Sequence, residues 1–129
     1  MISIFCGCSR DAETAAKARD ADPNIINGSW KEQSTGLVIS IIYHKENNYG
    51  AAFVSETGTA FPPSAKRGRC IDNVRFIRGL YWEGDSYKYF PAGTGGSTTN
   101  VWKSPSIVGF AMRSGGNEFV MGTKTYRKL

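Results

Sequence analysis

From Ile25 onward, the apolar residues recur in short runs with a period of about two, the spacing of half-buried β-strands. Turn-forming residues separate the runs at "KENN", "ETGT", "FPPSAKRGR", "WEGDS" and "AGTGGST". The runs are "GLVISIIYH", "YGAAFVSE", "NVRFIRGLYW", "SYKYF", "TNVW", "SIVGFAM" and "EFVMGTKTY". This pattern predicts about seven strands, in the spacing typical of a β-sandwich, barrel or prism.

The run from Gly36 to His44 carries apolar residues on both faces. Alternation places Leu37, Ile39, Ile41 and Tyr43 on one side of the strand, with Val38 and Ile42 on the other. A strand that is apolar on both sides is predicted to be central in its sheet.

The first 24 residues differ from the rest. "ISIFC", residues 2–6, predicts an opening strand, and "SRDAETAAKARDAD" predicts a short helix near residues 10–21 with Ser9 or Asp11 as its cap and Pro23 just beyond. The apolar face of that helix is only alanine, which favours a surface helix or a partly disordered arm. We therefore expect one domain, with residues 1–24 as an N-terminal arm and residues 25–129 as the β core.

Composition supports an all-β fold. The 129 residues include 15 glycines and 12% aromatics, which favours many short strands over a helical bundle. Three cysteines, Cys6, Cys8 and Cys70, are expected to be reduced thiols, and neither a metal nor a cofactor is predicted.

The N-terminal segment lacks the basic region of a signal peptide, and no apolar stretch reaches the roughly 20 residues of a membrane span. We expect a protein that is cytoplasmic, or exported without a recognisable signal peptide.

Residues with acid–base chemistry are few. His44 lies in a predicted hairpin turn, and the carboxylate pairs Glu83 with Asp85 and Asp20 with Asp22 are flanked by loop residues. No nucleophile, base and orienting group occur at a recognisable spacing, so the sequence predicts that the chain is not an enzyme.

Three stretches resemble jacalin-related lectins. "SIVGFAMRSGG" is similar to the last strand pair of that family, and "IRGLYWEGDSYKYFPAG" to its strand and hairpin that end in a Tyr-Gly-Pro-Phe-Gly-like turn. "ISIIYHKENNYG" is similar to an early strand of the family. The matching positions are Ile107 to Phe110, Arg113 to Gly115, Gly122, Tyr89, Pro91 and Gly93. The resemblance implies an antiparallel Greek-key β-prism-like domain.

The same resemblance implies a carbohydrate site in the last hairpin. The family uses a Gly-x-x-x-Asp turn; here Gly115 and Phe119 align with its ends, and Glu118 is the neighbouring acid. The resemblance thus implies weak, multivalent glycan binding, with a homo-oligomer supplying several copies. The expected sugar-binding residues are Arg113, Ser114, Gly115, Gly116, Asn117, Glu118, Gly95, Gly96 and Asn100.

Two other function classes stay open. "NGSWKEQSTGLVIS" resembles the Gly-x-Trp opening of calycins such as avidins and lipocalins. In that small β-barrel, Trp30 would close the floor below an apolar cavity, with Lys124 or Arg127 over the indole.

The formal charge of +5 and the run "AKRGR" also permit weak, non-specific binding of single-stranded nucleic acid. In that case Tyr81, Trp82 and Tyr87 would stack on bases.

Overall fold

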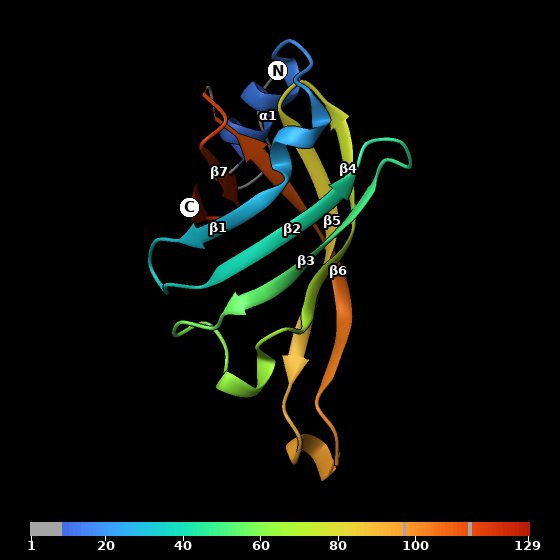
Figure 1. Cartoon of the computed structure of the whole chain (residues 1–129), viewed down its shortest axis with the longest axis vertical. Coiled ribbons are helices and arrows are strands. Elements are labelled where there is room, and N and C mark those ends of the chain that lie inside the picture. The colour runs from blue at the N-terminus through green and yellow to red at the C-terminus, as the bar shows by residue number, and fades with distance from the viewer. Residues whose placement is uncertain (1–8, 97, 114) are drawn as a thin grey trace.

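A computed structural model describes residues 9–96, 98–113 and 115–129. Eight strands form one closed antiparallel barrel in which each strand pairs with its neighbours in sequence and β1 pairs with β8 (Figure 1). The strands are β1 (Gly28–Glu32), β2 (Val38–His44), β3 (Tyr49–Glu56), β4 (Arg69–Arg78), β5 (Tyr81–Phe90), β6 (Val101–Met112), β7 (Glu118–Met121) and β8 (Lys124–Lys128).

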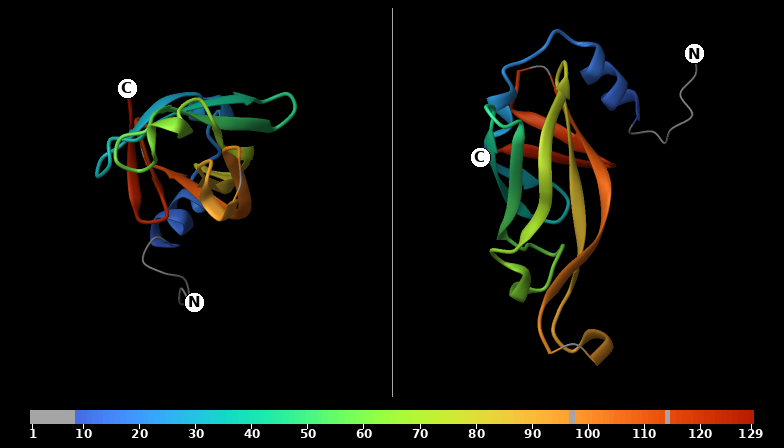
Figure 2. Two further views of the ribbon diagram at one scale, coloured as in Figure 1. Left: turned by 90° about the horizontal axis from the view of Figure 1, so that it is seen from below. Right: turned by 90° about the vertical axis from the view of Figure 1, so that its right-hand side faces the viewer.

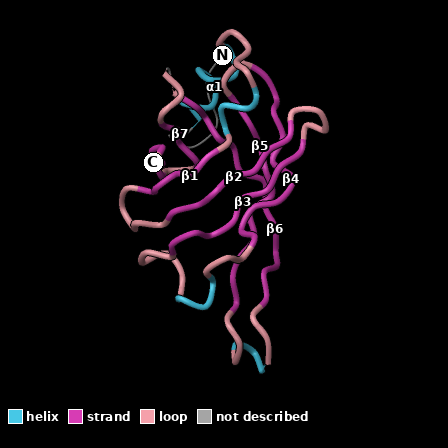
Figure 3. The backbone as a smooth tube through the Cα atoms, in the orientation of Figure 1, coloured by secondary structure: helices cyan, strands magenta, loops and turns pink. Residues whose placement is uncertain are grey.

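The all-β prediction and the single short helix are confirmed. The Greek-key prism is not what forms, because the strand order is sequential around the barrel. The helix α1 (Ser9–Lys17) and the 3₁₀ turns η1 (Pro23–Ile26), η2 (Pro63–Ala65) and η3 (Thr94–Gly96) are the helical elements of the described residues (Figure 3). The expected strand at residues 2–6 lies outside those residues.

The alternation predicted in the second strand is confirmed on its inner face. Ile39, Ile41 and Tyr43 are buried, whereas Ile42 on the outer face is 53% exposed. The prediction of a central strand is wrong, because no strand of a closed barrel is central. The second apolar face of β2 instead places Ile42 on the outer wall, where it is exposed.

Two of the runs that were predicted as single strands each contain a hairpin turn between two strands. Gly79 and Leu80 divide "NVRFIRGLYW" between β4 and β5, and Gly122 with Thr123 divides the last run between β7 and β8. Both glycines have positive φ, +61° and +65°, as the tight turns of β-hairpins require.

Strand β6 unites two runs that the sequence pattern separates. Its register with β5 shifts by one residue between Ser86 and Lys88, and Ser104 there has φ of +58°. Pro105 has no N–H to donate, so a β-bulge accommodates it without ending the strand. The resulting β5–β6 hairpin extends beyond the barrel, away from α1 (Figure 2).

Helix α1 is attached to the barrel by the β4–β5 turn. The Leu80 N–H donates to the Ala15 carbonyl at 2.8 Å, and the Gly79 N–H donates to the Asp20 carboxylate at 2.7 Å. Ala15 is only 3% exposed. The described part of the N-terminal arm is therefore packed against the β core.

Candidate functional site

The turn predicted to bind sugars is held by ion pairs. Glu118 accepts hydrogen bonds from Arg113 and, at 3.0 Å, from the Nε of Arg127, and Arg113 also lies 3.7 Å from Asp11 of α1. Gly115 and Gly116 have positive φ and shape the turn, while Asn117 is exposed. A sugar would have to displace arginine from Glu118. Ser114 lies outside the described residues.

The other half of the predicted site lies at the tip of the β5–β6 hairpin. Gly95 and Gly96 belong to η3, and the Asn100 side chain accepts the Ala92 N–H at 2.8 Å to close the tip. Strand β6 separates this tip from the turn at residues 113–118, and its 12 residues span roughly 36 Å. The structure therefore does not bring the two halves together (Figure 2).

One end of the barrel is closed by η1, which we call the plug (residues 23–26). Trp30 donates its indole N–H to the Ile26 carbonyl at 3.0 Å, and Trp82 donates to the Pro23 carbonyl at 3.2 Å. Both tryptophans and Ile26 are fully buried. Asp22 caps the turn by accepting the Asn24 N–H at 3.0 Å. The two indoles thus fix the plug to the core.

The Gly-x-Trp sequence has a steric role at the same end. Lys128 pairs with Trp30 across β1 and β8, and its Nζ lies 5.4 Å from the centre of the indole ring. A Cβ at residue 28 would lie 3.0 Å from the Lys128 Cε, so Gly28 leaves room for the lysine stem. The cation over the indole is therefore Lys128, not Lys124 or Arg127, which contact Ser34 and Glu118.

The barrel interior is filled by side chains. The Phe119 ring packs against Trp30 at 4.8 Å, Tyr126 at 4.9 Å and Phe110 at 5.2 Å between ring centroids. All four rings are buried. An eight-stranded barrel can be filled by side chains or can hold one small ligand. Around Phe119, the described part of the interior is occupied by these four rings and not by a cavity.

Two residues after Trp30, β1 ends at a buried carboxylate, Glu32. Glu32 is 3% exposed and accepts the Ser34 N–H at 2.8 Å and the Thr35 N–H and hydroxyl at 2.9 and 2.6 Å. Burial raises the pKa of Glu32, but these hydrogen bonds lower it more, to about 2. The carboxylate therefore orders the β1–β2 turn.

The end of the barrel opposite the plug carries what we call the aromatic end: Phe61, Tyr89 and Trp102. Phe61 and Trp102 pack against the core, and the Trp102 ring lies 4.7 Å from Tyr89 and 5.4 Å from Phe61 between centroids. Backbone at Gly68 lies against the indole, since a Cβ there would be 2.4 Å from its Nε1. All three rings are half-buried.

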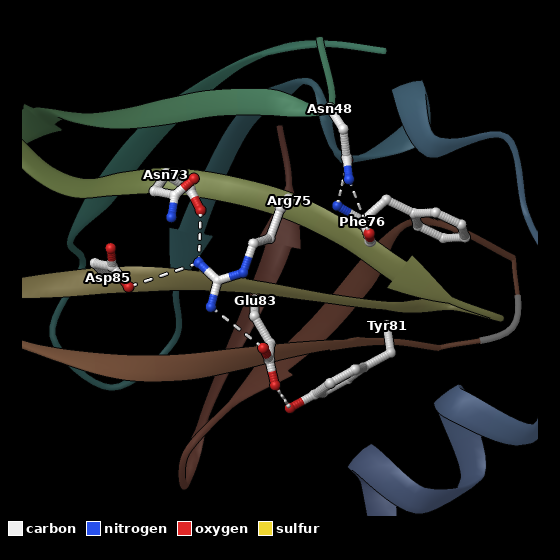
Figure 4. Close-up of polar contacts among 7 residues, drawn as sticks. All are labelled: Asn48, Asn73, Arg75, Phe76, Tyr81, Glu83 and Asp85. Atoms are coloured by element: carbon white, nitrogen blue, oxygen red, sulfur yellow. Dashed lines mark hydrogen bonds and ion pairs between the residues drawn. The ribbon is translucent and has the colours of Figure 1, made fainter. Parts of the chain in front are cut away.

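The suspected carboxylate pair lies on the outer wall (Figure 4). Arg75 on β4 lies 3.3 Å from Glu83 and 3.6 Å from Asp85, and it donates to the Asn73 carbonyl at 3.0 Å. Tyr81 donates to Glu83 at 3.4 Å. These contacts assign both carboxylates to an ion-pair network between two strands.

The other residues that the sequence singled out do not form a site together. His44 is exposed at the end of β2, and burial raises the pKa of the Cys70 thiol to about 12. Trp82 is fully buried, so it cannot stack on a base. Cys6 and Cys8 lie outside the described residues.

No group of His, Cys, Asp or Glu side chains suited to a metal ion occurs within residues 9–96, 98–113 and 115–129. Within these residues no helix has the length and apolar character needed to cross a membrane. No family model, curated protein or solved structure matched the chain significantly.

Proposed function

We propose that the chain is a non-catalytic binding protein for small, largely apolar ligands, built on a calycin-like barrel. The observation that supports the proposal is the plugged end, where Gly28 and Trp30 of the calycin-like motif lie beside Lys128, which is over the indole in place of the expected Lys124 or Arg127. Because fold resemblance alone does not specify function, the ligand site has to be argued from the other end.

The two ends of the barrel differ in how firmly they are closed. Indole hydrogen bonds fix the plug, whereas the aromatic end is covered by half-buried rings and by the β3–β4 loop, residues 57–68. The Ser64 and Tyr89 hydroxyls share one hydrogen bond of 2.6 Å between the loop and β5. Moving this loop would expose apolar rings while leaving the barrel strands paired. We therefore place the ligand at the aromatic end.

A ligand panel tests this proposal. Medium-chain alcohols, polyenes, aromatic compounds and soluble saccharides are added to the whole protein, and the unfolding temperature and the tryptophan fluorescence are measured. A ligand at about 100 times its Kd would add about 2.7 kcal/mol to the unfolding free energy. We expect apolar members of the panel to stabilise the protein and to change the emission of Trp102.

Variants locate the site. Phe61→Ala and Trp102→Ala should weaken binding, whereas Ile107→Ala, which truncates a 66% exposed side chain on the outer wall, should not. Equal binding by all three variants, or stabilisation by no apolar compound, overturns the proposal. Stabilisation by saccharides alone, lost on exchanging Asn117 and Glu118 for alanine, would instead support the jacalin-like expectation.

A further inference from the structure

An open hollow lies on the outer wall of the barrel, over β2 and β3 and beside the chain that leads into β4. Its volume is about 530 Å³, and its lining is mostly apolar. It is formed by Ile42, Phe53, Val54, Ser55, Lys66 and Arg67. The volume is in the range of small-molecule sites. Its lining contains none of the three rings of the aromatic end, although Lys66 and Arg67 belong to the β3–β4 loop that covers that end.

Three cations border this hollow, and their partners differ. Lys66 lies 3.4 Å from Glu56, and Arg69 lies 3.4 Å from Asp72 while its guanidinium is 5.5 Å from the Phe53 ring centre. The side chain of Arg67 has no hydrogen bond or ion pair with any residue that the structure describes. Among the described residues, no carboxylate thus compensates the charge of Arg67 at the hollow.

The backbone of Arg67 is unusual. Its φ of +74° lies in the left-handed region that favours glycine, at a cost of about 1 kcal/mol for other residues. The Arg67 N–H donates to the Val54 carbonyl at 2.7 Å, and the Gly68 N–H donates to the Ala65 carbonyl at 3.0 Å. These bonds hold the strained residue at the rim of the hollow. A glycine would adopt this backbone more easily, so an exchange to glycine would relieve the strain.

A row of hydroxyls ends at the same hollow. Ser29 and Ser40 lie 3.0 Å apart, and Ser40 and Ser55 lie 2.5 Å apart, across three neighbouring strands. Three hydroxyls that share two hydrogen bonds leave one hydroxyl hydrogen, which lies on Ser29, Ser40 or Ser55 according to the directions of the two bonds. When it lies on Ser55, the hollow has a donor besides Arg67.

We propose that this hollow binds a small amphipathic monoanion. Its apolar body lies on Ile42 and Phe53, and its anionic group accepts hydrogen bonds from the guanidinium of Arg67. An arginine can bind a carboxylate or sulfonate with two parallel hydrogen bonds. A polyanion fits less well, because the carboxylates of Glu56 and Asp72 border the same surface and repel further negative charge.

Decanoate tests the proposal, with decanol as its neutral counterpart and an oligothymidylate as a polyanion. Binding is measured by titration calorimetry on the whole protein. The key variant is Arg67→Gly, which removes the guanidinium and also relieves the left-handed backbone. We expect it to weaken decanoate binding by about tenfold or more without lowering the unfolding temperature. Lys17→Ala, which removes one exposed charge from α1, is the matched control and should leave decanoate binding unchanged.

Each other result overturns the proposal in a distinct way. Decanoate binding that survives Arg67→Gly but is lost in Phe61→Ala assigns the ligand to the aromatic end and leaves the proposed function intact. Equal affinity for decanol and decanoate reduces the hollow to an apolar patch. Tighter binding of the oligothymidylate, with a steep loss in salt, favours a nucleic-acid surface. The absence of any decanoate binding removes the site.

Discussion

At the scale of single residues, Glu32 is a buried carboxylate whose ionised form stabilises the native fold. Its oxygens accept two backbone N–H groups of the next turn, from Ser34 and Thr35, so the ionised form is favoured by the native state. The pattern of alternating polar and apolar residues does not predict such a group, because its partners are the backbone amides of a turn and not a cation.

The pKa of Glu32 gives a pH dependence with a defined sign. The folded-state pKa of about 2 lies below the usual 4.5, so the contribution is complete above pH 4.5 and is lost as the pH falls toward 2. The shift corresponds to about 3 kcal/mol. Urea unfolding at pH 5.5 and pH 2.5 should show this loss in the parent and a smaller loss in Glu32→Gln. An equal acid-induced loss in both proteins would contradict the assignment.

Gly28 and Lys128 form a second residue-scale pair. Gly28→Ala adds a Cβ at φ of +133° and 3.0 Å from the Lys128 stem, and we expect it to lower the free energy of unfolding by about 1–3 kcal/mol. In the Lys128→Ala background the same exchange should cost less, because only the backbone strain remains. Chemical denaturation of the four proteins of the cycle measures the coupling. Strict additivity would show that the lysine stem does not press on residue 28.

At the scale of elements, the sequence predicted the strands better than their connections. Period-two runs located β2 and β3 because one face of each is buried against the core. The turns at Gly79 and Gly122 were missed because each is hidden inside an apolar run. The bulge at Ser104 was missed because proline usually ends a strand, and here the register shift absorbs it.

The two halves of the predicted sugar site lie apart for an element-scale reason. The two polar segments were expected to meet in one site. They flank a single strand, β6, and therefore lie at its opposite ends. In contrast, the glycine and the tryptophan of the calycin-like opening could be recognised from the sequence, because both lie in one short motif. The lysine above the indole depends on the β1–β8 register, which a motif does not contain.

The docking of α1 depends on the β4–β5 turn. A Cβ at Gly79 would lie 2.2 Å from the Ala15 carbonyl oxygen, so Gly79→Ala should push the helix from the barrel and speed amide exchange in residues 9–21. Gly93→Ala is the control, because that glycine also has positive φ but nothing lies within 4 Å of its added Cβ. If both variants leave exchange in α1 unchanged, the turn does not hold the helix.

At the scale of the whole molecule, closure makes the β core one unit. Every barrel strand pairs on both sides, and Trp30 and Trp82 are buried in the same core cluster. We expect two-state unfolding in which far-ultraviolet circular dichroism and tryptophan fluorescence give coincident denaturant curves. Transitions that separate would indicate that the plugged end unfolds independently of the sheet.

Closure also bears on the expected oligomer. The weak lectin-like site was expected to gain avidity from a homo-oligomer. Among the described strands, β6 pairs with β7 only at Ala111 and Met112, so residues 101–110 of β6 have no strand partner on that side. Assembly, where it occurs, would use this edge or side-chain faces such as the outer wall around Ile42 and Ile107. Sedimentation of the parent and of an Ile42→Ser, Ile107→Ser double variant would detect such association.

The projecting β5–β6 hairpin makes the barrel a natural display scaffold. At its tip, an added Cβ at Gly93 or Gly96 meets no atom within 4 Å, so a side chain at either position would have open space. Exposed tips of this kind accept inserted sequence with little entropic penalty, because loop-closure entropy grows only slowly with length. A foreign peptide grafted between Gly93 and Gly96 would therefore be presented well away from the plug. The graft should leave the packing of the barrel core unchanged.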